Sequence, residues 1–143
     1  FVGRQDAAGV DVVSEATASS EKYKEAVAHA LEKARITPVV KSTYYEGVYF
    51  GRSAEDDEGY GIAFITVEGD KISVVKLDDV NKDGTLKDWP VYQYTKALEA
   101  RASMEKKFVE ENSAVIDTYS GATQSSAKWI QAVQDALQNA KVR

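Results

Sequence analysis

The sequence predicts an α+β fold: an antiparallel sheet of about three to four strands with helices packed on it, plus an N-terminal helix. The middle of the chain carries segments rich in β-branched and aromatic residues, and two segments with helical periodicity follow them. Strands that come first and helices that come after them are typical of helices covering one face of an antiparallel sheet. A further helical segment lies near the amino terminus, in a stretch that is similar to the carboxyl end of the same chain.

The expected strands are residues 44–50, 59–67 and 72–77, which are rich in β-branched and aromatic side chains. Glu68-Gly-Asp70 separates the second strand from the third, and Asn81-Lys-Asp-Gly84 follows the third. Both segments are typical turn sequences, since glycine adopts a positive φ at little cost. These segments therefore predict strands joined by tight turns.

Two helices are expected after the strands. The first runs from Pro90 to about Asn112, because proline is tolerated in the first turn of a helix and apolar residues recur there at helical spacing. The last helix begins at Ser125 or Ser126 and runs to about Lys141.

The composition limits the chemistry that the side chains perform by themselves. The 143 residues are about one domain's worth, and 43% of them are hydrophobic, which suffices for a sizeable core. The net charge of −5 argues against a nucleic acid or an anionic membrane surface as the partner. The absence of cysteine excludes disulfides and thiol chemistry, and a single histidine disfavours a histidine-based metal site or triad. We therefore expect the chemistry to come from a cofactor.

The sequence contains no segment that is expected to span a membrane. No stretch of the sequence approaches the roughly 20 apolar residues that cross a bilayer. Because the chain begins at Phe1 rather than at a methionine, we expect an export signal or lipid anchor upstream. Contact with a membrane would then be made only through that anchor.

Two segments match when the chain is laid over itself at an offset of 106 residues. Asp11–Ser20 and Asp117–Ser126 share the pattern Asp-x-x-Ser-x-Ala-Thr-x-Ser-Ser, and apolar positions downstream also match. Helical periodicity explains the apolar matches but not the shared pattern. We interpret residues 1–35 as a partial repeat and residues 36–143 as the complete domain. In the alternative arrangement, the helix of the first segment packs on the same core.

The second copy of this pattern combines residue types that suit a phosphate. Ser120, Gly121 and Ala122 are small, so the backbone can approach a ligand closely. A helix begins directly after them, and its free N–H groups and dipole favour an anion. Thr123 offers a hydroxyl in that position.

A simpler interpretation is that a serine merely caps the helix after an ordinary turn. Capping requires one polar residue, whereas the two copies share an aspartate, a Ser-x-Ala-Thr element and a pair of serines. The repetition therefore favours a functional loop.

The segment Asp117-Thr-Tyr-Ser-Gly-Ala-Thr123 resembles the flavinylation motif of the bacterial FMN-binding domain family. This family includes periplasmic domains of sodium-pumping quinone reductase and Rnf-type complexes, and flavinylated lipoproteins. The likeness extends to Tyr45-Glu-Gly-Val-Tyr49, to Val67–Ile72 and to Asn81–Gly84, so that it covers residues 44–140 and, in part, residues 9–35.

In this family, a separate FAD-dependent flavin transferase attaches FMN through its phosphate to the hydroxyl of the motif threonine and releases AMP. The resemblance implies that Thr123 is the acceptor. It implies that Ser120, Gly121 and Ala122 shape the loop. Asp117 would help to present the loop to the transferase, and Ser125 and Ser126 would cap the helix.

The resemblance implies an FMN-carrying electron-transfer module rather than an enzyme. It also implies an extracytoplasmic setting, in the periplasm or at the cell surface, with a membrane tether in the full-length protein. Its partners would be the transferase and a redox protein, a quinone or an electron-transfer chain. Two alternatives are a flavin-free binding or surface-interaction module with the same fold, and a domain of a larger flavin reductase.

The first copy departs from the family pattern, because Glu15 stands where glycine is expected. A side chain there obstructs close approach of a ligand, and a carboxylate repels a phosphate. We therefore expect Asp11, Ser14 and Thr17 to form a degenerate second site whose threonine does not carry flavin.

One weaker pattern resembles the opening of a metal-binding loop. Asp79-Val-Asn-Lys-Asp-Gly84 matches the opening of a calcium loop, but the twelfth position is Pro90 rather than glutamate. We interpret this segment as a turn and assign no metal ligand.

Overall fold

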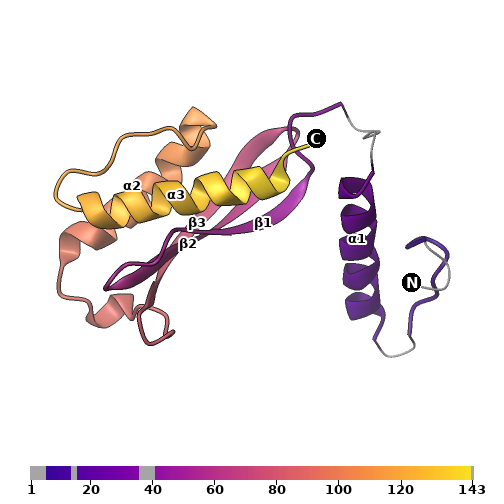
Figure 1. The fold of residues 1–143 in the computed structure, drawn as a ribbon, viewed down its shortest axis with the longest axis horizontal. Helices are drawn as coiled ribbons and strands as arrows, with labels where there is room; N and C mark the ends of the chain where they lie inside the picture. Colours follow the sequence, from indigo (N-terminus) through magenta and orange to yellow (C-terminus); the bar gives the residue numbers. More distant parts are fainter. Residues whose placement is uncertain (1–5, 14–15, 36–40, 143) are drawn as a thin grey trace. The chain divides into compact units, whose positions relative to one another are not determined.

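The computed structural model describes residues 6–13, 16–35 and 41–142. The chain divides into two compact units: Ser42–Lys141 forms one, and Phe1–Lys41 with Val142–Arg143 forms the other (Figure 1). We describe each unit by itself.

The larger unit contains a three-stranded antiparallel sheet in the order β1-β2-β3. The strands are β1 (Gly47–Arg52), β2 (Gly59–Glu68) and β3 (Lys71–Asn81). Between β2 and β3 the chain turns at Gly69 and Asp70, whose φ angles are 56° and 63°. Two consecutive positive φ angles match the right-handed twist of a hairpin, which confirms the turn that the sequence predicts here.

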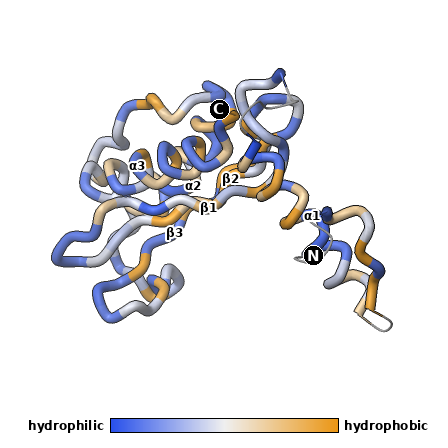
Figure 2. The backbone as a smooth tube through the Cα atoms, turned by 45° about the vertical axis from the view of Figure 1, so that its right-hand side comes forward, coloured by the Kyte–Doolittle hydropathy of each residue, from blue (hydrophilic) through white to orange (hydrophobic). Residues whose placement is uncertain are grey.

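A layer of two helices covers this sheet (Figure 1). Helix α2 (Thr95–Glu111) packs against β3, and helix α3 (Thr123–Ala140) packs against β1 and β2. The expected α+β fold is thereby confirmed. Hydrophilic residues occupy the turns at the ends of the sheet (Figure 2).

The first of these helices starts later than the sequence predicts. Trp89–Val91 forms a short 3₁₀ helix with Pro90 in its first turn, and the chain then becomes extended at Tyr92, where ψ is 115°. Helix α2 begins only at Thr95. Proline suits the first turn of either helix type, so its presence alone does not distinguish one long helix from two.

The core lies between the sheet and the helices. Its fully buried side chains come from both layers, and the largest are Trp129, Phe108, Ile65, Met104, Val67 and Val133. Close packing of α3 on the sheet depends on Gly51, because a Cβ atom there would lie 2.1 Å from the carbonyl oxygen of Ala132. The opposite face of the sheet is exposed and includes Phe50 and Phe64, whose rings are 5.3 Å apart.

The smaller unit is built around helix α1 (Thr17–Lys33), which confirms the expected N-terminal helix. None of the residues of α1 itself is buried. The predicted domain boundary at residue 36 lies outside the described residues. Within the described ranges, no helix combines the length and apolar character that a membrane crossing requires.

Candidate functional site

The predicted flavin loop connects α2 to α3. Ala122 is the N-cap residue of α3, with φ −140° and ψ 39°, and Thr123 is the first helical residue. The helix therefore begins two or three residues earlier than expected, and no side chain caps it. The prediction that Ser125 or Ser126 caps α3 is wrong, because both lie inside its first turn.

Ser126 instead fastens the loop to the helix. Its hydroxyl is fully buried, donates to the carbonyl oxygen of Ala122 at 2.7 Å and accepts the N–H of Tyr119 at 3.0 Å. A hydroxyl that bonds on both sides leaves no buried polar atom unpaired. The second serine of the motif thus has a structural role that helix-capping rules do not anticipate.

The start of α3 presents backbone donors beside an exposed hydroxyl. The first hydrogen bond within the helix runs from the N–H of Ser126 to the carbonyl oxygen of Ala122, at 2.9 Å. The N–H groups of Thr123, Gln124 and Ser125 therefore precede the first helical hydrogen bond. Thr123 is the first residue of α3, so its hydroxyl lies near the positive end of the helix dipole. The residue is also exposed.

Gly121 is required for its backbone conformation rather than for space. Its φ is +84°, which side chains disfavour, whereas an added Cβ would meet nothing closer than 3.5 Å, at Cδ of Lys96. The hydroxyl of Tyr94 donates to the Gly121 carbonyl oxygen and links the loop to the segment before α2. The sequence does not predict that Tyr94 contacts the loop, because Tyr94 lies 27 residues from its acceptor.

A cavity of about 320 Å³ opens at the threonine. Its lining combines the loop with aromatic and polar side chains: Glu58, Tyr92, Tyr94, Gly121, Ala122, Thr123, Gln124 and Ser125. Of the other predicted site residues, Asp117 and Ser120 are exposed, and Ser126 is buried behind the loop. The structure thus brings Gly121, Ala122, Thr123 and Ser125 to one cavity.

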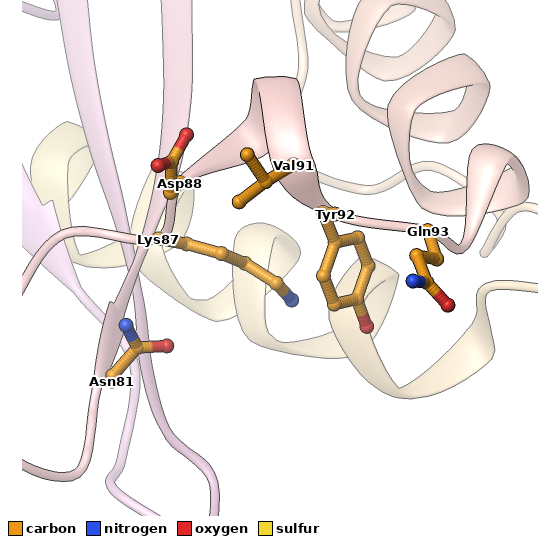
Figure 3. Close-up of a pocket in the computed structure, with 6 residues that line it drawn as sticks. All are labelled: Asn81, Lys87, Asp88, Val91, Tyr92 and Gln93. Carbon is orange, nitrogen blue, oxygen red and sulfur yellow. The ribbon is translucent and has the colours of Figure 1, made fainter.

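A second cavity, of about 440 Å³, shares one wall residue with the first. It is lined by Asn81, Lys87, Asp88, Val91, Tyr92 and Gln93 (Figure 3). Tyr92 is the common residue, because it also lines the cavity at Thr123. The side chain of Lys87 extends towards the Tyr92 ring, and its Nζ lies 4.0 Å from the ring centroid.

Behind this second cavity lies a buried carboxylate. Burial raises the pKa of Asp79 above its ordinary value, and the neighbouring Lys87 ammonium opposes that rise. The carboxylate accepts from Lys87 Nζ at 3.2 Å and from Trp129 Nε1 at 2.8 Å. Both oxygens are therefore engaged by side chains, in agreement with a structural role for the segment that resembles a calcium loop.

The predicted degenerate site begins α1. Thr17 is the first residue of this helix, as Thr123 is of α3, and Asp11 is exposed. Ser14, together with the departing residue Glu15, lies outside the described residues.

One hydrogen bond recurs in the two copies. The N–H of Val13 donates to Ser20 Oγ at 3.2 Å, as the N–H of Tyr119 donates to Ser126 Oγ at 3.0 Å. Each pair is separated by seven residues, and the corresponding positions differ by the same offset of 106 that relates the sequences.

Comparison with known proteins identifies the family of this chain. A search of curated proteins finds no match. The crystal structure of the CPE2226 protein from Clostridium perfringens is similar, with 26% identity and a TM-score of 0.57 over 68% of this chain and 88% of that one. The sequence model described as "FMN-binding domain" matches residues 53–138, which is more than half of the chain. The protein therefore belongs to the FMN-binding domain family and is a flavin-binding module.

Proposed function

We propose that this protein is an electron-transfer module that carries FMN covalently, through a phosphoester to Thr123. The observation that carries the proposal is the exposed hydroxyl of Thr123 at the first residue of α3, beside a cavity. A flavin phosphate at this point would meet the positive end of the helix rather than bulk water.

The residues present fit the phosphate of FMN. Backbone N–H groups of Thr123, Gln124 and Ser125 precede the first hydrogen bond of α3 and suit phosphate oxygens. Gly121 and Ala122 place only small side chains beside them. Glu58 is the one acidic residue in the lining, and phosphoester formation reduces the phosphate charge that it faces.

The attachment step needs FAD and a separate flavin transferase as partner. The oxygen of the Thr123 hydroxyl forms a bond to the phosphorus of the FMN half of FAD. The pyrophosphate P–O bond breaks, AMP leaves with the bonding electron pair, and the hydroxyl proton passes to a base. No electron is gained or lost, so the step requires no oxidant. Exposure of Thr123, Asp117 and Ser120 leaves the loop accessible to a transferase.

When bound, the flavin supplies the redox chemistry, and the protein supplies position and electrostatics. The chain's own residues hold the phosphate at α3 and keep the loop in one conformation through Ser126 and Tyr94. We propose an extracytoplasmic setting with a membrane tether outside these residues, where a covalent bond prevents loss of the cofactor. The electron partner is then a redox protein or a quinone of an electron-transfer chain.

Intact mass tests this function directly. Chain produced together with a flavin transferase, then denatured and separated from free flavin, is expected to gain the mass of one attached FMN. Chain produced without the transferase provides the control and is expected to lack the adduct. No adduct under transferase co-production would favour the flavin-free binding module. Flavin reductase activity that appears only when this chain is joined to further domains would favour the alternative of a larger flavin reductase whose active site lies elsewhere.

We further propose that residues 1–35 are a partial repeat and residues 36–143 the FMN-binding domain. The recurring hydrogen bond of Val13 with Ser20 supports this. The matching positions of α3 are buried against the sheet: Trp129, Ala132, Val133, Ala136, Leu137 and Ala140. In the complete protein, we expect the apolar face of α1 to be covered by the sheet of a second copy of the domain. Hydrogen exchange tests this: amides of α1 should be poorly protected in the present chain and well protected in the full-length protein.

A further inference from the structure

Tyr92 lines both cavities, so a ligand that is attached at Thr123 in the first cavity can extend past this tyrosine into the second. Thr123 lines the first cavity, and Tyr92 lines both the first cavity and the second. FMN consists of a phosphate, a flexible ribityl chain and a flat aromatic ring. A phosphate fixed in the first cavity therefore leaves the ring free to reach the second.

Lys87 is held in a fixed position within this second cavity. Its side chain is only 16% exposed, and its Nζ lies 3.2 Å from Asp79 Oδ2 and 4.0 Å from the centroid of Tyr92. Asp88 also lines the cavity, but its carboxylate points away from Tyr92 (Figure 3). Lys87 is therefore the charged group that faces the tyrosine ring.

We propose that the flavin ring lies against Tyr92 in this second cavity, and that Lys87 is the residue that raises its reduction potential. This inference rests on the proposed function. A reduced flavin ring accumulates negative charge at its pyrimidine end, and a partly buried ammonium stabilises that charge more than one in water does. Asp79 acts as a positioning residue, since it holds Lys87 in place.

The rest of the lining suits the same ring. Asn81 and Gln93 bring amide groups, which both donate and accept hydrogen bonds, as the pyrimidine end of a flavin does. Val91 provides apolar surface for the dimethylbenzene end, and Tyr92 adds an aromatic ring, one face of which is covered by Lys87. The cavity thus combines aromatic, amide and cationic groups, a combination that small-ligand sites commonly use for orientation.

The first test is the reduction potential of the loaded chain, measured by redox titration. Lys87→Gln should shift the flavin midpoint to a more negative potential, whereas Lys87→Arg should stay close to the wild type. Lys106→Gln is the matched control, because it removes the same charge from an exposed position on α2 and should leave the potential unchanged. A loaded, folded Lys87→Gln protein with the wild-type potential would overturn the inference.

The second test is flavin fluorescence, which tests the position of the ring independently of whether Lys87→Gln folds, while Lys87→Arg against Lys106→Gln still tests the potential. A stacked tyrosine quenches flavin emission by donating an electron to the excited ring, so Tyr92→Leu should brighten the attached flavin. Tyr23→Leu, which changes an exposed tyrosine of α1, should not. Equal emission from the wild type and Tyr92→Leu would overturn the proposed ring position.

The two proposals fail in distinguishable ways. Absence of a covalent adduct at Thr123 contradicts the proposed function. If FMN is attached at Thr123 but Lys87→Gln leaves its reduction potential unchanged and Tyr92→Leu leaves its emission unchanged, only the inference about the ring is contradicted.

Discussion

Thr123 separates function from stability at the scale of a single residue. Its side chain is exposed and does not cap α3, so Thr123→Ala should change the free energy of unfolding by no more than about 0.5 kcal/mol. The same substitution should abolish covalent flavin, whereas Thr123→Ser keeps a hydroxyl and should retain part of the loading. Intact mass after denaturation measures the loading, and thermal unfolding measures stability.

Thr17→Ala is the control for this prediction, because Thr17 occupies the equivalent helix position in the first copy. Loading should remain at the wild-type level. Flavin that persists on the Thr123→Ala protein after denaturation would show that another residue is the acceptor. Equal modification of both threonines would contradict the argument from Glu15.

Asp70 couples the β2–β3 turn to the chain before β1. Its carboxylate accepts the N–H groups of Thr43 at 3.0 Å and Tyr44 at 2.8 Å, and these bonds lower its pKa. A folded-state pKa below the unfolded one contributes stability above the unfolded value, about 3.9, and loses it as the pH falls through the folded value.

Asp70→Asn should therefore lower stability at neutral pH and flatten the loss of stability on acidification. Asparagine tolerates the positive φ of this position, so the substitution tests the charge rather than the backbone. Denaturant unfolding curves between neutral pH and pH below about 4 measure both effects. An unaltered pH dependence in the variant would show that the carboxylate does not act through these bonds.

The contact between α3 and β1 depends on one glycine. A Cβ at Gly51 would lie 2.1 Å from the Ala132 carbonyl oxygen and 2.3 Å from the Ala136 nitrogen, both of them backbone atoms. Because backbone cannot move aside as a flexible side chain can, Gly51→Ala should destabilise the protein by about 3 kcal/mol or more. Chemical denaturation measures the change.

Gly69→Ala is the matched control at the hairpin. An added Cβ there meets nothing within 4 Å, although φ is +56°. The expected loss is about 1 kcal/mol, from backbone strain alone. Equal losses at the two glycines would contradict the importance of the close helix–sheet approach.

At the scale of elements, local sequence patterns predicted which segments are strands or helices better than they predicted where those strands and helices begin and end. The sequence predicted three strands and the hairpin turn between the second and third, because side-chain alternation and turn residues act over short distances, although β1 starts three residues later and β3 ends four residues later than expected. It missed the start of α3, since Ser125 and Ser126 are good caps, yet the buried Ser126 is needed to bond Tyr119. A hydrogen bond that spans seven residues of the same segment thus replaced the expected cap.

For the whole molecule, the flavin-binding unit should not need the amino-terminal segment. Every residue of the main hydrophobic core cluster lies between Ala63 and Ala140. A chain that starts at Ser42 should therefore unfold at the same temperature as the complete chain and load flavin equally well. Thermal unfolding and intact mass measure the two properties.

Removal of Thr123–Ala140 provides the contrasting deletion, because it takes away seven buried residues together with the proposed acceptor, Thr123. That chain should neither fold cooperatively nor load flavin. A large drop in stability after loss of residues 1–41 would show instead that the amino-terminal segment supports this domain.

The sequence by itself determined the fold class, the family and the loop that carries the candidate acceptor Thr123. These properties depend on residues that are close together in the chain, namely alternating strand residues, glycines in turns and a contiguous motif before a helix. The tertiary structure alone decided which side chains surround that threonine. Tyr94 bonds Gly121 across 27 residues, and Asp79 bonds Trp129 across 50. Such pairs form when packing brings distant segments together, and no local spacing in the chain records them.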